Sequence, residues 1–203
     1  MPNGQLAQLS TPPQRLREIL YINFFSEVNP ISISQLINVI QQGLQRGKKK
    51  FFLFISSTGG NLMSGIVAYN FLKNIPNEII TYNYAYTESV AILIFCAGDK
   101  RYCLPNSRFI FHEIVSGGMQ GSKRAIKDSL KVLDFDIQRY ISIISDTTSQ
   151  SKKKIEKDMS TLNILDAKKA KEYGLVQEIK DKLPSIENEE TITISIWPQP
   201  QKS

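Results

Sequence analysis

Apolar residues along this chain follow two periods, one typical of strands and one typical of helices. Short runs rich in β-branched and aromatic residues are typical of strands; they lie at 18–24, 49–56, 78–86 and 175–179, with two more expected within 101–114 on either side of the turn Pro105-Asn106. Apolar residues spaced three or four apart predict helices; these segments are 34–47, 61–75, 123–148, 151–159 and 166–173. Strands that alternate with helices predict an α/β fold with a mostly parallel sheet.

The segment 90–97 differs from the others because it is apolar on every side. Eight residues, Val90 to Ala97, follow directly on the polar triplet Thr87-Glu88-Ser89. A helix without a polar face belongs in the centre of a domain. Ser89 is therefore expected at the mouth of a buried helix, where it could either cap the helix or react with a substrate.

Composition supports a single substantial globular domain. The chain has 203 residues, of which 41% are hydrophobic and 22% charged, as is ordinary for globular proteins. No run is long enough to cross a bilayer, and the first residues lack the pattern of a signal peptide, so a cytoplasmic protein is expected. Cys96 and Cys103 lie in apolar surroundings and suit reduced core thiols better than a disulfide or a metal site.

The net charge of +6 does not by itself indicate a nucleic-acid partner. Its lysines and arginines are dispersed in small groups, and those at 151–171 alternate with acidic residues on predicted helices. No helix-turn-helix, zinc-finger or RNA-recognition signature accompanies them. We therefore do not expect a nucleic-acid partner. The sequence also leads us to expect no membrane, metal or cofactor as a partner.

Three features together could hydrolyse an amide, which requires a nucleophile, a base and donors for an oxyanion. Ser89 precedes a helix, and His112, the only histidine, ends a predicted strand. The loop at 57–60 ends in Gly59-Gly60, whose backbone can approach a substrate closely. Each also has an ordinary interpretation: a helix cap, a tight turn and a structural histidine.

The ordered set of motifs resembles the proteolytic subunit of the Clp protease (ClpP), a family of serine peptidases with a crotonase-like fold. "FLFISSTGGNLMSGIVAYNFL" resembles the family's strand, "SPGG" loop and helix, and "TESVAILIFCAGDKRYCLPNSRFIFHE" resembles its "AASMGA", "LPNSR" and "IHQP" segments. "GGMQG" at 117–121, "IEKD" at 155–158 and "AKEYGLV" at 170–176 follow in the same order. The resemblance covers about 51–179 and implies a ββα superhelix with a long handle helix at 123–148.

By position, the resemblance makes Ser89 the nucleophile and His112 the general base. Gly60 and Val90 would supply the amides of the oxyanion hole. Gly117, Gly118 and Met119 would line a groove in which an extended peptide adds as a strand. The implied organisation is a flexible arm at 1–15, the ClpP-like domain at 16–183, and an edge strand and polar tail at 184–203, where the strand could also be exchanged with a partner.

Two substitutions depart from the family pattern. An ungapped alignment from "IEKD" to "KEYGLV" places Leu162 where the family has its triad aspartate; Asn163 could accept a hydrogen bond from the histidine but carries no charge. Glu88 replaces a small apolar residue, and its charge would oppose an oxyanion unless a basic side chain pairs with it. Loss of the aspartate's charge costs such triads about 10⁴ in rate.

Three hypotheses follow. The chain could be a ClpP-like peptidase active through Ser89 and His112 in a ring of seven or fourteen subunits. It could instead be a catalytically degraded structural subunit of such a ring, which Leu162 and Glu88 favour. A crotonase-like enzyme acting on acyl thioesters is the third, although no paired carboxylates of a hydratase occur. An AAA+ unfoldase is a possible partner, but the segment before residue 50 lacks the family's docking loops.

Overall fold

The computed structural model describes residues 18–115, 117–118, 120–185 and 190–196. The predicted arm at 1–15, Met119 and most of the polar tail lie outside the described residues. The first half of the chain contains β1 (Ile19–Phe24), α1 (Pro30–Gln45), β2 (Lys50–Ser57), α2 (Leu62–Asn74), β3 (Glu78–Glu88), α3 (Ala91–Cys96) and β4 (Lys100–Cys103). The second half contains β5 (Arg108–Phe111), α4 (Lys123–Thr148), α5 (Lys152–Ser160), β6 (Asn163–Asp166), α6 (Ala167–Glu172), β7 (Glu178–Ile179) and β8 (Glu190–Ile194).

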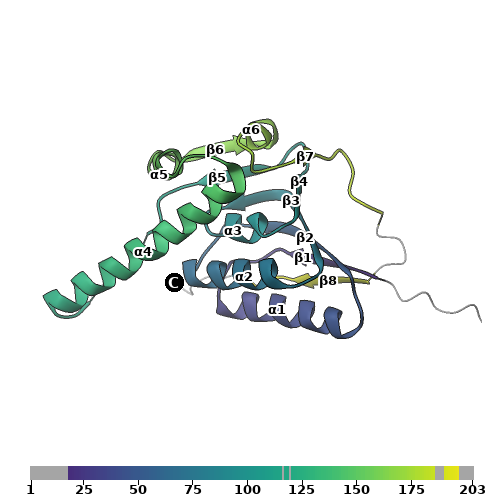
Figure 1. Ribbon diagram of the computed structural model, residues 1–203, viewed down its shortest axis with the longest axis horizontal. Coiled ribbons are helices and arrows are strands. Elements are labelled where there is room, and N and C mark those ends of the chain that lie inside the picture. Colours follow the sequence, from purple (N-terminus) through teal and green to yellow (C-terminus); the bar gives the residue numbers. More distant parts are fainter. Residues whose placement is uncertain (1–17, 116, 119, 186–189, 197–203) are drawn as a thin grey trace, which may run out of the picture.

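These elements form a mixed α/β fold around one sheet, which confirms the predicted fold class (Figure 1). The main path is β6-β5-β3-β2-β1-β8, and β4 and β7 extend the sheet beside the first half of β3. Every pairing is parallel except that of β5 with β6. β8 lies at the edge of the sheet and pairs with β1 of the same chain.

The main core lies between the sheet and helices α1, α2 and α3, which cover one face (Figure 1). All six residues of α3 are buried, as expected for a helix that is apolar on every side. A second, aromatic cluster covers the other face of the sheet; its buried members are Tyr21, Phe54, Ile80 and Tyr82. Within the described residues, none of the helices combines the length and apolarity needed to cross a membrane.

Helix α1 begins earlier than the sequence suggested. Asn29, five residues before the predicted start at residue 34, is its N-cap: the Asn29 side chain accepts hydrogen bonds from the amides of Ile31 and Ser32. Ser32 completes a capping box by accepting from the Asn29 amide, and Pro30 occupies the first turn, where its missing N–H costs nothing.

Helix α4 is the predicted long helix, with the predicted bounds. It has 26 residues, and its buried residues begin only at Asp136. Its N-terminal half therefore extends away from the body of the domain (Figure 1). Several large apolar side chains are exposed on this half and on the adjacent α2; they are Leu130, Val132, Phe135, Met63 and Val67.

Candidate active site

Ser89 occupies a strained turn between β3 and α3. Its φ angle is 52°, in the left-handed region that residues with a side chain rarely adopt. Its amide donates a hydrogen bond to the Ile110 carbonyl (2.9 Å), and its carbonyl accepts from the Ile92 amide (3.0 Å) and the Tyr140 hydroxyl (3.1 Å). Strain of this kind persists only where the surroundings hold it, and it occurs often at functional sites.

The Ser89 side chain does not cap α3. Val90 is the N-cap residue, and it makes no side-chain hydrogen bond to the helix. The capping interpretation of Ser89 is therefore wrong. Ser89 is 7% exposed, and no hydrogen bond joins its hydroxyl to another group among the residues that the structure describes.

The glycine loop after β2 lies directly against Ser89. Gly59 has a φ of 91°, and a Cβ at this position would lie 2.8 Å from the Ser89 Cβ and from the Glu88 carbonyl oxygen. Gly60 has a φ of 142° and pairs as an isolated bridge with Val28. Only glycine permits both the conformation and the close approach.

The loop geometry leaves two amides available near Ser89. The Gly59 carbonyl accepts from Val28 and the Asn61 amide donates to Val28, so the Gly60 amide is not used in this bridge. In the part of the chain that the structure describes, the amides of Gly60 and Val90 donate no hydrogen bond. These are the two predicted oxyanion-hole donors, and their assignment stays a prediction.

His112 follows the strand next to Ser89. The parallel register pairs Glu88 with Ile110, so Phe111 is level with Ser89 and His112 is one residue further. Adjacent strands are about 4.8 Å apart. Among the described residues no hydrogen bond joins the His112 ring to Ser89; such bonds often form only when substrate is bound.

A main-chain carbonyl holds the His112 ring. Nδ1 of His112 is 2.8 Å from the Glu113 carbonyl oxygen. A carbonyl oxygen only accepts, so Nδ1 must carry the proton and Nε2 of the neutral ring is left as the acceptor. This is the tautomer that a general base requires.

The single histidine makes this tautomer directly measurable. We expect ¹⁵N NMR of the neutral ring of His112 to show a protonated Nδ1 and an unprotonated Nε2, because the Glu113 carbonyl accepts from Nδ1. No other histidine contributes to the spectrum. A ring protonated mainly at Nε2 would contradict the observed contact and would leave the ring unable to accept the serine proton through that atom.

Leu162 is the residue predicted to stand at the position of the triad aspartate. β5 and β6 pair antiparallel with Phe111 opposite Asn163 as the last pair, so His112 and Leu162 both lie just beyond the same end of this ladder. Leu162 has a left-handed φ of 53° and is 57% exposed. Asn163, the alternative partner, starts β6, and within the described residues it makes no hydrogen bond to the His112 ring.

Glu88 forms an ion pair with Arg108. From the sequence alone it was open whether a basic side chain would pair with this carboxylate. Its carboxylate accepts hydrogen bonds from Arg108 Nη2 (2.8 Å) and Nε (3.1 Å). The Arg108 guanidinium also lies 5.6 Å from the centre of the Tyr86 ring. This pair offsets the negative charge of Glu88 beside Ser89, so Glu88 does not argue against an oxyanion there.

Two of the predicted groove residues, Gly117 and Gly118, lie on the surface. Gly117 and Gly118 are exposed in an irregular segment between β5 and α4, and a Cβ at either would meet no atom within 4 Å. Their place in a substrate groove stays a prediction. In the part of the chain that the structure describes, no group of three or more metal-ligating side chains occurs.

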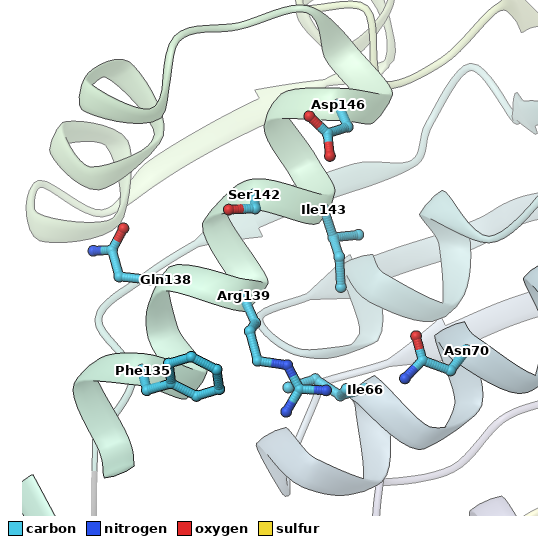
Figure 2. Close-up of a pocket in the computed structure, with 8 residues that line it drawn as sticks. All are labelled: Ile66, Asn70, Phe135, Gln138, Arg139, Ser142, Ile143 and Asp146. Atoms are coloured by element: carbon cyan, nitrogen blue, oxygen red, sulfur yellow. The ribbon is translucent and has the colours of Figure 1, made fainter. Parts of the chain in front are cut away.

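A cavity of about 360 Å³ lies between α2 and α4, away from this site (Figure 2). Its lining residues are Ile66, Asn70, Phe135, Gln138, Arg139, Ser142, Ile143 and Asp146. The Arg139 side chain extends toward Ile66, and its guanidinium pairs with Asp136 at 3.1 Å. Neither Ser89 nor His112 lines the cavity, so it does not extend the candidate active site.

Two contacts of the site could not be read from the sequence. Tyr140 lies in phase with the apolar residues of its helix, so the sequence predicted its burial. It did not predict the contact of the Tyr140 hydroxyl with the Ser89 carbonyl. Arg108 lies nineteen residues after Ser89, and it reaches Glu88 because β3 and β5 are neighbours in the sheet.

The comparisons with known proteins agree with this description. The family model of the Clp protease matches residues 10–182. Among solved structures, an asparagine-to-aspartate mutant of ClpP1 from Listeria monocytogenes is similar, with a TM-score of 0.73 and 24% sequence identity. The match covers 82% of this chain and 92% of that chain. The structural likeness supports the fold, and the family match extends over most of the chain.

Proposed function

Because this chain belongs to the Clp protease family, we propose that it is a serine peptidase that cleaves extended peptides, with Ser89 as nucleophile and His112 as general base. The observation that carries this proposal is the strained backbone of Ser89 at the junction of β3 and α3. The Ser89 amide donates a hydrogen bond to the carbonyl of Ile110, and His112, the only histidine, lies two residues after Ile110. The Gly59-Gly60 loop packs against the same serine.

In the proposed reaction, the Ser89 hydroxyl oxygen attacks the carbonyl carbon of the scissile bond. Its proton moves to Nε2 of His112 and then to the departing amine as the C–N bond breaks. The amides of Gly60 and Val90 stabilise the oxyanion of the tetrahedral intermediate. Water then attacks the acyl-enzyme, gives a proton to His112, and that proton returns to Ser89 as the peptide acid leaves.

The site has a positioned histidine, and among the described residues no carboxylate forms an ion pair with its ring. The Glu113 carbonyl fixes the tautomer of the ring, yet a neutral carbonyl stabilises the imidazolium less than a carboxylate does. A serine–histidine pair with an oxyanion hole still retains catalysis over water. The proposed activity is therefore slow compared with that of a complete triad.

We further propose that the peptidase acts as a ring-shaped oligomer of seven or fourteen subunits. The exposed apolar side chains on α4 and α2 support self-association, because an apolar surface of this kind is typical of an interface. The groove beside Gly117 and Gly118 would then face the interior of the ring and bind an extended peptide as an added strand.

A second function has one specific observation in its favour. Leu162 is apolar and lies just beyond the end of the β5–β6 ladder at which His112 also lies, as expected for a ring subunit that has lost catalysis. Hydrolysis of a fluorogenic extended peptide distinguishes the two functions when the assembled wild type is compared with Ser89→Ala. Turnover that disappears in the variant supports the peptidase; turnover equal in both, or absent from both, supports the degraded subunit.

A further inference from the structure

Tyr140 is a buried residue of α4 whose hydroxyl contacts the backbone of the candidate nucleophile. The side chain is 1% exposed and belongs to the main core. Its hydroxyl donates a 3.1 Å hydrogen bond to the Ser89 carbonyl oxygen. This is the only side-chain hydrogen bond to the Ser89 backbone among the residues that the structure describes.

The carbonyl that Tyr140 contacts belongs to the peptide unit that also carries the Val90 amide. A peptide unit is planar, and in the trans form its C=O and N–H point in opposite directions. No cis peptide bond occurs in the described residues. A hydrogen bond that fixes the direction of the Ser89 C=O therefore also fixes the direction of the Val90 N–H.

We propose that Tyr140 is a positioning residue that orients the Val90 amide toward the oxyanion by holding the Ser89 carbonyl. This inference rests on the proposed function, in which the Val90 amide stabilises the oxyanion. The left-handed conformation of Ser89 makes such a constraint necessary, because a strained peptide unit relaxes when its contacts are removed. The Ile92 amide is the second donor to the same carbonyl, so Tyr140 supplies one of two constraints.

The hydroxyl of Tyr140 is protonated at neutral pH and can donate this hydrogen bond, because even an exposed phenol has a pKa of about 10. Burial raises the pKa of the Tyr140 phenol well above its ordinary value. This shift favours the protonated hydroxyl, which is the form that donates the hydrogen bond.

Tyr140→Phe tests the proposal because it keeps the ring and removes only the hydroxyl. We expect the rate at which a fluorophosphonate probe labels Ser89 to fall about tenfold, less than the 10²–10³ typical of a deleted oxyanion donor, since the Ile92 amide still holds the carbonyl. In peptide hydrolysis, kcat should fall by the same factor and KM should not change, because the oxyanion is absent from the ground-state complex and forms only in the tetrahedral intermediate and its flanking transition states.

Tyr21→Phe is the matched control. The Tyr21 hydroxyl also donates to a main-chain carbonyl, that of Ser185, at 3.0 Å, and its ring is also buried, on the other face of the sheet. We expect this variant to label within about twofold of the wild-type rate, as for an interaction remote from the site. Equal slowing in both variants would assign the effect to loss of a buried hydroxyl in general and would overturn the proposal.

The labelling rates distinguish a failure of the role of Tyr140 from a failure of the proposed peptidase function. If the wild type and Tyr140→Phe are labelled at the same rate, the role of Tyr140 is overturned and the peptidase stands. If the wild type is not labelled at all, the proposed function fails, and hydrogen exchange of the Val90 and Ile92 amides decides the role of Tyr140. Faster exchange in Tyr140→Phe than in Tyr21→Phe supports it, and equal exchange overturns it.

Discussion

Replacing Leu162 with aspartate is expected to raise peptidase activity at least tenfold, up to a limit of about 10⁴-fold. Leu162 and His112 lie just beyond the same end of the β5–β6 ladder, so we expect a carboxylate at residue 162 to approach the imidazolium that forms during attack. The site should accept it, because Leu162 is mostly exposed and has a left-handed backbone, which aspartate adopts more readily than leucine. kcat/KM for an extended peptide measures the effect.

Leu162→Asn is the control for this substitution. Asparagine has nearly the shape of aspartate and also tolerates the left-handed backbone, but it lacks the charge. We expect it to leave kcat/KM within a few-fold of the wild type. A gain of the same size in both variants would mean that relief of backbone strain, and not charge, limits the site. No gain in Leu162→Asp would favour the degraded ring subunit.

Replacing Gly59 with alanine is expected to reduce labelling and hydrolysis by at least about 10²-fold. The added methyl group would lie 2.8 Å from the Ser89 Cβ and the Glu88 carbonyl oxygen, and 3.1 Å from the Val90 nitrogen. The nucleophile, the oxyanion amide or the loop must therefore move. A displacement of about 1 Å in an active site can cost about 10² in rate.

Gly47→Ala separates this steric effect from the backbone effect. Gly47 also has a left-handed φ, 77°, but a Cβ there meets no atom within 4 Å. Both variants incur the cost of about 1–2 kcal/mol for a left-handed alanine. Only Gly59→Ala should lose activity while it remains folded and assembled. Retained activity in folded Gly59→Ala would remove the glycine loop from the proposed site.

The sequence predicted the fold well where periodicity and length agreed. The buried helix after Ser89 and the 26-residue α4 have patterns that only one secondary structure satisfies. β6 was missed because its four residues lie between two helical segments and show no alternation of their own. The strand predicted at 175–179 is shorter in the structure, where β7 has only two residues. Its length is set by its pairing with β4, and the pattern within 175–179 contains no information about that partner.

The contacts around the candidate site could not be predicted from the sequence. The motifs around Ser89, His112 and Gly60 led only to the prediction that these residues share a site. They could not indicate that Ser89 is strained, because φ depends on the contacts of Gly59 and Tyr140. Nor could they indicate that the Glu113 carbonyl holds the ring, since every residue has such a carbonyl.

The central claim is that Ser89 is an activated nucleophile despite Leu162. It is tested most directly by incubating the assembled wild type and Ser89→Ala with a fluorophosphonate probe and measuring intact mass. We expect one adduct per chain on the wild type and none on the variant. A wild type that forms no adduct at any pH at which the assembly is intact, or an adduct that persists in Ser89→Ala, would contradict it.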